Sequence, residues 1–187
     1  MKINSLSLIS LATILTATSA NAGAVADFYI GGMVGAGGET VFMDGKDSTD
    51  SSMVYGAVAG VDIPLFRFEG EYNHLNSDAI SANTAMFNMY FKVPSTLILP
   101  YVGAGIGSVF SGDHTIKADG IKTTYDIKST AAYQGMLGAT IDLPALPVKF
   151  DVEGHVLYSP NIYENPVTFD TPDLLQYNVR AKLRVIF

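Results

Sequence analysis

Three neighbouring residues, His74, Ser77 and Asp78, are of the types that hydrolytic enzymes use as base, nucleophile and orienting acid. Such catalysis requires the three groups to converge at one point. The two other histidines offer no second candidate, because His114 is expected in a loop and His155 is expected to be a hydrogen-bonded interior residue. One histidine near one serine is a weak signal, so we predict that the protein is not an enzyme.

Two further patterns resemble ligand sites but lack the necessary spacing. The run from Gly103 to Gly107 has glycine at every second position, whereas a dinucleotide-binding turn needs G-x-G-x-x-G and opens a helix. The acidic segment 37–52 lacks the D-x-D-x-D-G spacing of an EF-hand loop. A solvated loop, or one bridged to anionic lipid by divalent cations, explains this segment better. We therefore predict no cofactor and no dedicated metal site.

The composition excludes several broad classes of protein. The chain has 187 residues, of which 48% are hydrophobic and 16% charged, with 18 glycines and no cysteine. A chain this apolar can bury enough surface to fold, which excludes disorder, and its glycines follow no collagen period. Beyond the N-terminus the apolar runs reach about eight residues, whereas a membrane-spanning helix needs about twenty. The apolar residues must therefore be spread over short alternating segments.

The N-terminal segment predicts export. Lys2 gives a small positive start, the stretch 6–18 is apolar and rich in hydroxyls, and Ala20-Asn21-Ala22 has the form of an A-x-A cleavage site. We predict a signal peptide over residues 1–22 and a mature domain over 23–187. A chain without cysteine in an exported protein must be stable without disulfides, which a closed β-barrel achieves through its continuous hydrogen-bond ladder.

Eight segments of roughly ten residues show the period-2 alternation of half-buried strands. These segments are 27–36, 53–63, 66–76, 83–93, 100–110, 130–141, 148–158 and 174–187. Short links that contain proline alternate with long polar links. The short links are 64–65, 94–99 and 143–147, and the long ones are 37–52, 77–82, 111–129 and 159–173. An even strand number with alternating short and long connections is typical of outer-membrane barrels.

Two Asp-Gly pairs refine the long links. Asp119-Gly120 stands between segments rich in threonine and isoleucine, which is a strong signal for a two-residue hairpin. We therefore expect the fifth and sixth strands to extend beyond the barrel. Asp44-Gly45 gives the same signal more weakly.

The strands have one apolar face and one charged face. In the segment from Tyr177 to Phe187, apolar residues alternate with Asn178, Arg180, Lys182 and Arg184. A soluble sandwich would turn the charges to water, whereas a small membrane barrel turns the apolar face to lipid and the charges into its lumen. We predict a structural polar network in the lumen made of Arg67, Glu69, Glu71, Lys92, Lys149, Asp151, Glu153, Arg180, Lys182 and Arg184.

Charge arithmetic supports this arrangement. Six acids and six bases fall on strands and tight turns, so the barrel body is neutral, while the long links carry the net negative charge. Balanced charge is what a narrow closed lumen requires, since an unpaired buried charge is costly. Glycines in the strands are expected to make room where long lumen side chains cross.

The strand rhythm, the segment from Pro100 to Gly107 and the terminal Phe187 resemble the small outer-membrane β-barrel proteins, which include the OmpA-type transmembrane domain, opacity-type proteins and barrel surface antigens. The resemblance implies an all-β fold, an eight-stranded antiparallel up-and-down transmembrane β-barrel, in the outer membrane of a Gram-negative bacterium. It also implies that Phe187 acts as the C-terminal signal for the barrel assembly machinery. The periplasmic domain of the longer OmpA proteins has no counterpart in this sequence.

The resemblance leaves two functions open. The first is an adhesin-like surface antigen that presents four extracellular loops to a host or environmental ligand, with contacts expected from Tyr125, Ile162, Tyr163 and Phe169. The second is a structural envelope protein whose loops contact lipopolysaccharide. A narrow porin is less favoured, because eight strands enclose only enough space for side chains. The acidic loops argue against nucleic acid as a partner.

Overall fold

The computed structural model describes residues 26–43, 46–77, 80–118, 121–126, 129–143, 146–160 and 173–187. The side chains of 41–50, 80 and 111–126 lie outside the described part, as does the predicted signal peptide. The strands are β1 (Asp27–Met43), β2 (Lys46–Asp62), β3 (Phe66–Ser77), β4 (Ile80–Lys92), β5 (Ile98–Ala118), β6 (Ile121–Asp126), β7 (Thr130–Asp142), β8 (Val148–Ser159) and β9 (Asp173–Ile186). The described part of the chain includes no helix long and apolar enough to cross a membrane.

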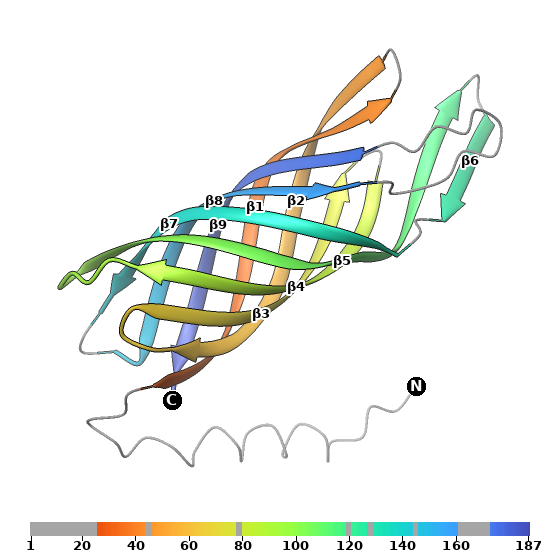
Figure 1. The fold of residues 1–187 in the computed structure, drawn as a ribbon. Helices are drawn as coiled ribbons and strands as arrows, with labels where there is room; N and C mark the ends of the chain where they lie inside the picture. Colours follow the sequence, from red (N-terminus) through yellow and green to blue (C-terminus); the bar gives the residue numbers. More distant parts are fainter. Residues whose placement is uncertain are drawn as a thin grey trace, which may run out of the picture.

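The strands form one closed antiparallel sheet. Their order is β4-β3-β2-β1-β9-β8-β7-β5-β6, and an additional pairing between β4 and β5 closes the wall. Eight strands therefore make the barrel, while β6 pairs with β5 outside the wall. This confirms the predicted eight-stranded up-and-down barrel, whose inclined strands are seen in Figure 1.

The two ends of the barrel differ. At one end, here called the turn end, the links 63–65, 93–97 and 143–147 connect neighbouring wall strands. Ile63 N–H donates to Phe66 O at 2.9 Å, and Phe187 N–H donates to Phe28 O at 3.0 Å, so the C-terminus lies beside the start of β1. At the other end, the hairpin end, β1–β2 and β5–β6 rise past the rest of the wall (Figure 1).

Several strands are longer than the sequence predicted. The predicted link 37–52 is mostly strand, since β1 and β2 remain paired up to Met43 and Lys46. The predicted link 77–82 shrinks to the two positions between β3 and β4. The alternation of apolar and polar residues is lost beyond residue 37, where Glu39-Thr40 is followed by Val41-Phe42-Met43, while the backbone pairing continues. The position of each Asp-Gly pair at a strand end is the one that a two-residue hairpin requires.

The hairpin predicted around Asp119-Gly120 is present in the strand pairing, since Ala118 lies opposite Ile121. Its second strand is β6, which ends at Asp126, while the sixth wall strand begins separately at Thr130. The expectation that wall strands five and six extend together was therefore wrong in detail. His114 was expected in a loop and instead lies in β5, opposite Ile80.

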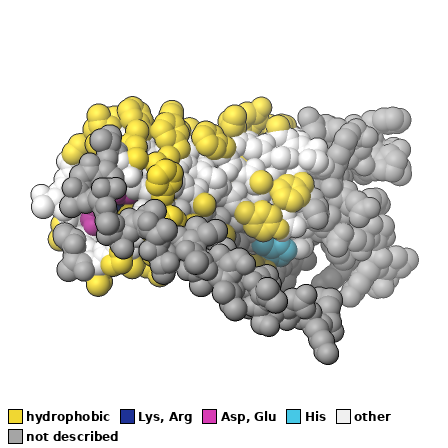
Figure 2. Space-filling model, turned by 90° about the horizontal axis from the view of Figure 1, so that it is seen from below, with side chains coloured by type: hydrophobic (Ala, Val, Ile, Leu, Met, Phe, Trp, Pro, Cys, Tyr) yellow, Lys and Arg dark blue, Asp and Glu magenta, His cyan; other side chains and the backbone are white. Residues whose placement is uncertain are grey.

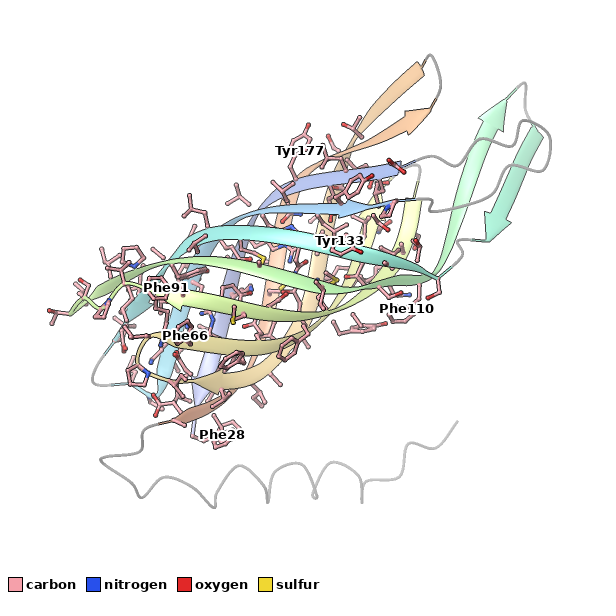
Figure 3. All side chains as sticks on the ribbon, in the orientation of Figure 1. Phe28, Phe66, Phe91, Phe110, Tyr133 and Tyr177 are labelled. Carbon is pink, nitrogen blue, oxygen red and sulfur yellow. The ribbon has the colours of Figure 1, made fainter. Side chains whose placement is uncertain are left out.

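Alternation divides the described wall into an inner and an outer face. The outer face carries large exposed hydrophobic side chains, such as Val34, Phe87 and Leu137, which is 70% exposed. Figure 2 shows such side chains along the described outer wall. The labelled aromatic side chains in Figure 3 point outward, with Phe28, Phe66 and Phe91 toward the turn end and Tyr133 and Tyr177 toward the hairpin end. The outer wall is therefore apolar with an aromatic residue near each end.

Three lumen tyrosines each pack on a glycine directly across the neighbouring strand. The pairs are Tyr29 with Gly60, Tyr90 with Gly103 and Tyr101 with Gly138. A Cβ atom at Gly60 would lie 2.6 Å from the Tyr29 hydroxyl oxygen, so a larger residue would displace the ring. Gly135 does not fit the expected role, because it faces outward and a Cβ there would meet no atom of the described chain within 4 Å.

Candidate functional site

The inner face gathers the ionisable residues singled out from the sequence. Nine of the ten are buried, and Lys149 is partly exposed at the turn end. With Asp62, the buried acids of the network are Asp62, Glu69, Glu71, Asp151 and Glu153, and the buried bases are Arg67, Lys92, Arg180, Lys182 and Arg184. The five acids balance the five bases, so this part of the lumen is neutral.

The cluster at the turn end is built around Asp151. The guanidinium of Arg184 donates to both of its carboxylate oxygens, from Nε at 2.6 Å and from Nη2 at 2.9 Å, and Arg67 Nη1 donates at 3.3 Å. Arg184 Nη1 also reaches Asp62 at 3.3 Å, and Asp62 pairs with Lys92. A two-point contact between arginine and carboxylate is among the strongest hydrogen-bonded pairs in proteins. Asp151 therefore holds two buried cations at once.

A second cluster lies in the middle of the lumen around Lys182. Its Nζ lies 2.9 Å from Glu69 Oε1, 3.3 Å from Glu153 Oε2 and 3.7 Å from Glu71 Oε2. Glu71 also accepts a hydrogen bond from Arg180 Nη1 at 2.7 Å. One lysine shared among three carboxylates links β9, β3 and β8 across the lumen.

Lys149 marks the edge of the network. It lies 3.5 Å from Asp142, 3.7 Å from Asp62 and 3.8 Å from Asp27, and its side chain is 16% exposed. These distances exceed hydrogen-bond length. Lys149 is therefore a mouth residue at the turn end rather than a member of the closed interior.

The lumen contains tyrosines that the sequence analysis missed. Tyr90 donates to Glu69 at 2.8 Å, Tyr101 donates to Glu153 at 3.1 Å, and Tyr29 donates to Glu69 at 2.8 Å. The Arg67 guanidinium lies 3.9 Å from the Tyr90 ring centroid and 4.6 Å from that of Tyr101. The sequence did contain a signal for these tyrosines, because residues two positions apart on a strand share a face. Tyr90 stands two positions before Lys92 and therefore lies on the same face of β4.

Hydrogen bonds between His155 and two amide side chains extend the network toward the hairpin end. His155 Nε2 lies 2.8 Å from Gln134 Oε1, and Gln134 Nε2 donates to Asn88 Oδ1 at 2.6 Å. Asn88 Nδ2 in turn donates to Glu71 Oε2 at 2.8 Å. His155 is thus a hydrogen-bonded interior histidine.

Beyond these hydrogen bonds, toward the hairpin end, the lumen contains a layer of aliphatic side chains that the sequence analysis did not foresee. Buried aliphatic side chains from seven strand positions form what we call the apolar layer: Val54, Leu75, Ala82, Val109, Ala132, Leu157 and Leu174. They belong to one hydrophobic cluster. Closer to the hairpin end, Ser77 donates to the buried Glu39. The described part of the lumen therefore has a charged half toward the turn end and a half toward the hairpin end, here called the apolar half. In the apolar half the apolar layer lies among buried polar side chains such as Glu39, Ser52 and Gln176.

The residues considered for catalysis do not converge. His74 lies on the outer face of β3, where its Nδ1 is 2.9 Å from Asn83 Oδ1 and its ring centroid lies 5.1 Å from that of Tyr55, with the two rings tilted by 47°. Ser77 lies on the inner face and bonds to Glu39. Asp78 lies outside the described residues. The interval of three positions from 74 to 77 puts the two side chains on opposite faces of one strand.

The residues expected to contact a ligand lie mainly in undescribed segments. Ile162, Tyr163 and Phe169 lie outside the described part of the chain, and Tyr125 lies in β6 without a described side chain. Among the described residues, no group of three or more His, Cys, Asp or Glu side chains is arranged to hold a metal ion.

A closed eight-stranded wall, apolar outside and ion-paired inside, is the architecture of the small outer-membrane barrels. The family model described as "outer membrane protein beta-barrel domain" matches residues 7–184. The chain belongs to this family. Its location is therefore the outer membrane. No curated protein sequence matches this chain.

Among the solved structures similar to this chain, the first named here shares its fold. Neisserial surface protein A (NspA) has a TM-score of 0.57 at 15% identity, with 86% of this chain and 97% of that chain covered. Ail, the attachment invasion locus protein of Yersinia pestis, has a TM-score of 0.40 at 13% identity, covering 84% of this chain and 99% of that chain. The outer membrane protease OmpT from Escherichia coli has a TM-score of 0.41 at 10% identity, covering 87% and 96%.

Membership in this family orients the molecule. Outer-membrane barrels have short periplasmic turns and longer extracellular loops, with aromatic residues at both membrane interfaces. The turn end is therefore periplasmic, and the β1–β2 and β5–β6 projections are extracellular. The exposed hydrophobic outer wall is the surface that contacts lipid.

Proposed function

We propose that this barrel is an adhesin-like interaction protein of the cell surface, whose β5–β6 hairpin contacts a ligand outside the cell. The observation that carries the proposal is the strand pairing past the wall. β5 runs to Ala118, and its last residues pair with β6 and not with the wall. A strand pair of this length costs backbone entropy to order and adds nothing to barrel closure. We therefore infer that the hairpin functions outside the membrane.

The filled lumen supports this proposal over transport. Arg67, Arg180, Lys182 and Arg184 are each no more than 1% exposed, and the apolar layer lies above them. A solute would have to break buried ion pairs and then cross aliphatic side chains. We accordingly propose that the protein is not a porin.

The same proposal assigns no catalytic activity to the protein. The separation of His74 and Ser77 on opposite faces of β3 supports it. A change in lipid A when the protein is expressed in a host strain, lost in a His74→Ala variant, would overturn it.

The test is binding of whole bacteria to a panel of host cells and matrix proteins. One variant replaces residues 113–126 by an Asn-Gly turn, and a second shortens 161–172 in the same way. Equal surface abundance and equal heat-modifiable mobility on gels serve as controls. Loss of binding in the first variant alone is the expected result. Full binding by that variant would contradict the role of the β5–β6 hairpin.

A structural role in the envelope is the second candidate, and the ion-paired lumen favours it. A barrel with cross-lumen pairs such as Arg180–Glu71 is stiff and needs no ligand to be useful. In that case the bacteria would adhere to no host cell or matrix protein of the panel. Deletion of the gene would make the outer membrane more sensitive to detergents.

We also propose that Phe187 is the recognition signal for the barrel assembly machinery. The backbone hydrogen bond from Phe187 N–H to Phe28 O supports this proposal, because it places Phe187 at the periplasmic end, where the first and last strands meet. Deletion of Phe187 should reduce the amount of folded barrel in the outer membrane while export continues. Normal levels of heat-modifiable protein would contradict this role.

A further inference from the structure

The outer wall contains a groove of about 1370 Å³, which we call the wall groove and which is lined by residues of β1–β4, β8 and β9. Its floor consists of small outward-facing residues: Gly32, Ala57, Ala59, Gly70 and Ala85. These residues are neighbours across strands, since Gly32 lies opposite Ala57 and Ala59 opposite Gly70. Larger side chains such as Ile30, Val34 and Tyr72 form its sides. The hollow is thus made by residue size on a face that is otherwise bulky.

Packing within the chain does not require the two floor glycines. A Cβ atom at Gly32 would come no closer than 3.9 Å to its nearest neighbour, and one at Gly70 no closer than 3.8 Å. At the inward Gly31, by contrast, a Cβ would lie 2.5 Å from Leu183 O. Glycine weakens a strand, so it usually marks a close approach of another group. Gly32 and Gly70 leave room for such a group from outside the chain.

A polar cluster closes the upper end of the groove. The Tyr72 hydroxyl donates to Asn83 Oδ1 at 3.1 Å, and His74 Nδ1 lies 2.9 Å from the same oxygen. Because an amide oxygen only accepts, Nδ1 is the donor, and Nε2 is the ring nitrogen not used in this bond. The Tyr55 ring packs beside the His74 ring in a tilted arrangement, with the centroids 5.1 Å apart. These polar groups belong to the outer face, beside the groove that His74 and Tyr55 help to line.

The cluster stands in the extracellular half of the apolar band. His74 is eight positions beyond Phe66, the first residue of β3, which is about 26 Å along a strand and about 20 Å of height at the usual tilt. The apolar band of such barrels is about 25 Å tall. With the aromatic Phe66 placed at the periplasmic edge of the band, His74 lies a few ångströms below its extracellular edge, and the groove below His74 lies in the hydrocarbon region.

We propose that the wall groove holds an acyl chain of a lipopolysaccharide molecule of the outer leaflet, with the His74–Asn83–Tyr72 cluster against its phosphorylated sugar headgroup. The groove continues the lipid-contacting wall, so its neighbour is lipid in any case. The extracellular height of the polar cluster selects the outer leaflet. A second barrel would present a convex wall, which fits a narrow groove poorly, whereas an acyl chain is slender. This inference is independent of the proposed ligand of the β5–β6 hairpin.

The test is retention of lipid by protein extracted from outer membranes in mild detergent, measured by native mass spectrometry. The variant Ala57→Leu with Ala59→Leu fills the floor of the groove. The matched control is Ala104→Leu with Ala131→Leu, two exposed outward alanines on β5 and β7 that do not line the groove. Unchanged heat-modifiable mobility shows that each variant is folded.

We expect the wild type and the control to retain lipopolysaccharide, and the filled-groove variant to retain roughly tenfold less. His74→Ala, which leaves the floor intact, should lower retention by a smaller factor and serves as the second variant if the first does not fold. Equal retention by wild type and by whichever of these variants folds would overturn the proposal. Retention of phospholipid in place of lipopolysaccharide by the wild type would overturn it as well.

Discussion

Toward the periplasm the lumen is filled by ion pairs, whereas toward the cell exterior the apolar layer lies among buried polar side chains such as Ser52 and Gln176. Both halves are built from the same inward-facing register of the same strands. Arg180 and Leu174, for example, lie on one face of β9. The comparison shows that strand parity decides which residues enter the lumen, while the residue type alone decides how the space is filled. Both fillings place buried side chains across the described lumen, which supports the proposal that the protein is not a porin.

The largest effect is expected from Asp151→Ala in the charged half. Removal of this carboxylate leaves Arg67 buried without its ion-pair partner and leaves Arg184 with Asp62 alone, and an orphaned buried charge costs about 3–5 kcal/mol. With two cations affected, we expect the upper part of that range, measured by urea unfolding of the barrel in vesicles. Val152→Ala on the lipid face of the same strand is the control. A cost below that of the control would contradict the cluster.

Arg180→Ala should cost less, on the order of 3 kcal/mol. Glu71 loses its 2.7 Å bond to Arg180 but keeps Asn88 at 2.8 Å and Lys182 at 3.7 Å. The same unfolding assay measures it. Unchanged unfolding would mean that this face of β9 does not point into the lumen.

In the apolar half, Leu157→Ala should cost about 2–3 kcal/mol, because a buried leucine leaves a cavity when it is truncated. Leu157 is 1% exposed within the hydrophobic cluster. Val156→Ala on the lipid face is the matched neighbour. Equal costs for the two substitutions would remove the distinction between the apolar layer and the outer wall.

The smallest effect is expected from Tyr101→Phe, about 1–2 kcal/mol. This change deletes the 3.1 Å hydrogen bond to Glu153 but keeps the ring that packs beside Arg67. Glu153 also retains Lys182. A loss as large as that of Asp151→Ala would show that the tyrosine hydroxyl carries more of the network than its geometry indicates.

The fold was predictable because alternation and link length are local properties of the sequence. Proline in the short links and the period-2 pattern of segments such as 148–158 were sufficient for an eight-stranded barrel. The lengths of β1, β2 and β5 were not predictable, since a strand beyond the membrane no longer needs an apolar face. There the ladder continues without the signal.

The contents of the lumen were predictable in face but not in partner. The parity of β9 identified Arg180 as an inward candidate, yet its carboxylate partner Glu71 lies 109 positions away in the chain, and no local pattern encodes that pairing. The apolar layer was missed because alternation vanishes where both faces of a strand are apolar. Val54, between Met53 and Tyr55, is such a case.

Electrical conductance of the purified barrel in a planar lipid bilayer tests the central claim most directly, because it asks whether the two lumen halves together close the barrel. The account predicts that the wild-type protein adds no steady current to that of the bare bilayer. A persistent open-channel current through the wild-type barrel would contradict the closed lumen and would favour the narrow-porin function instead.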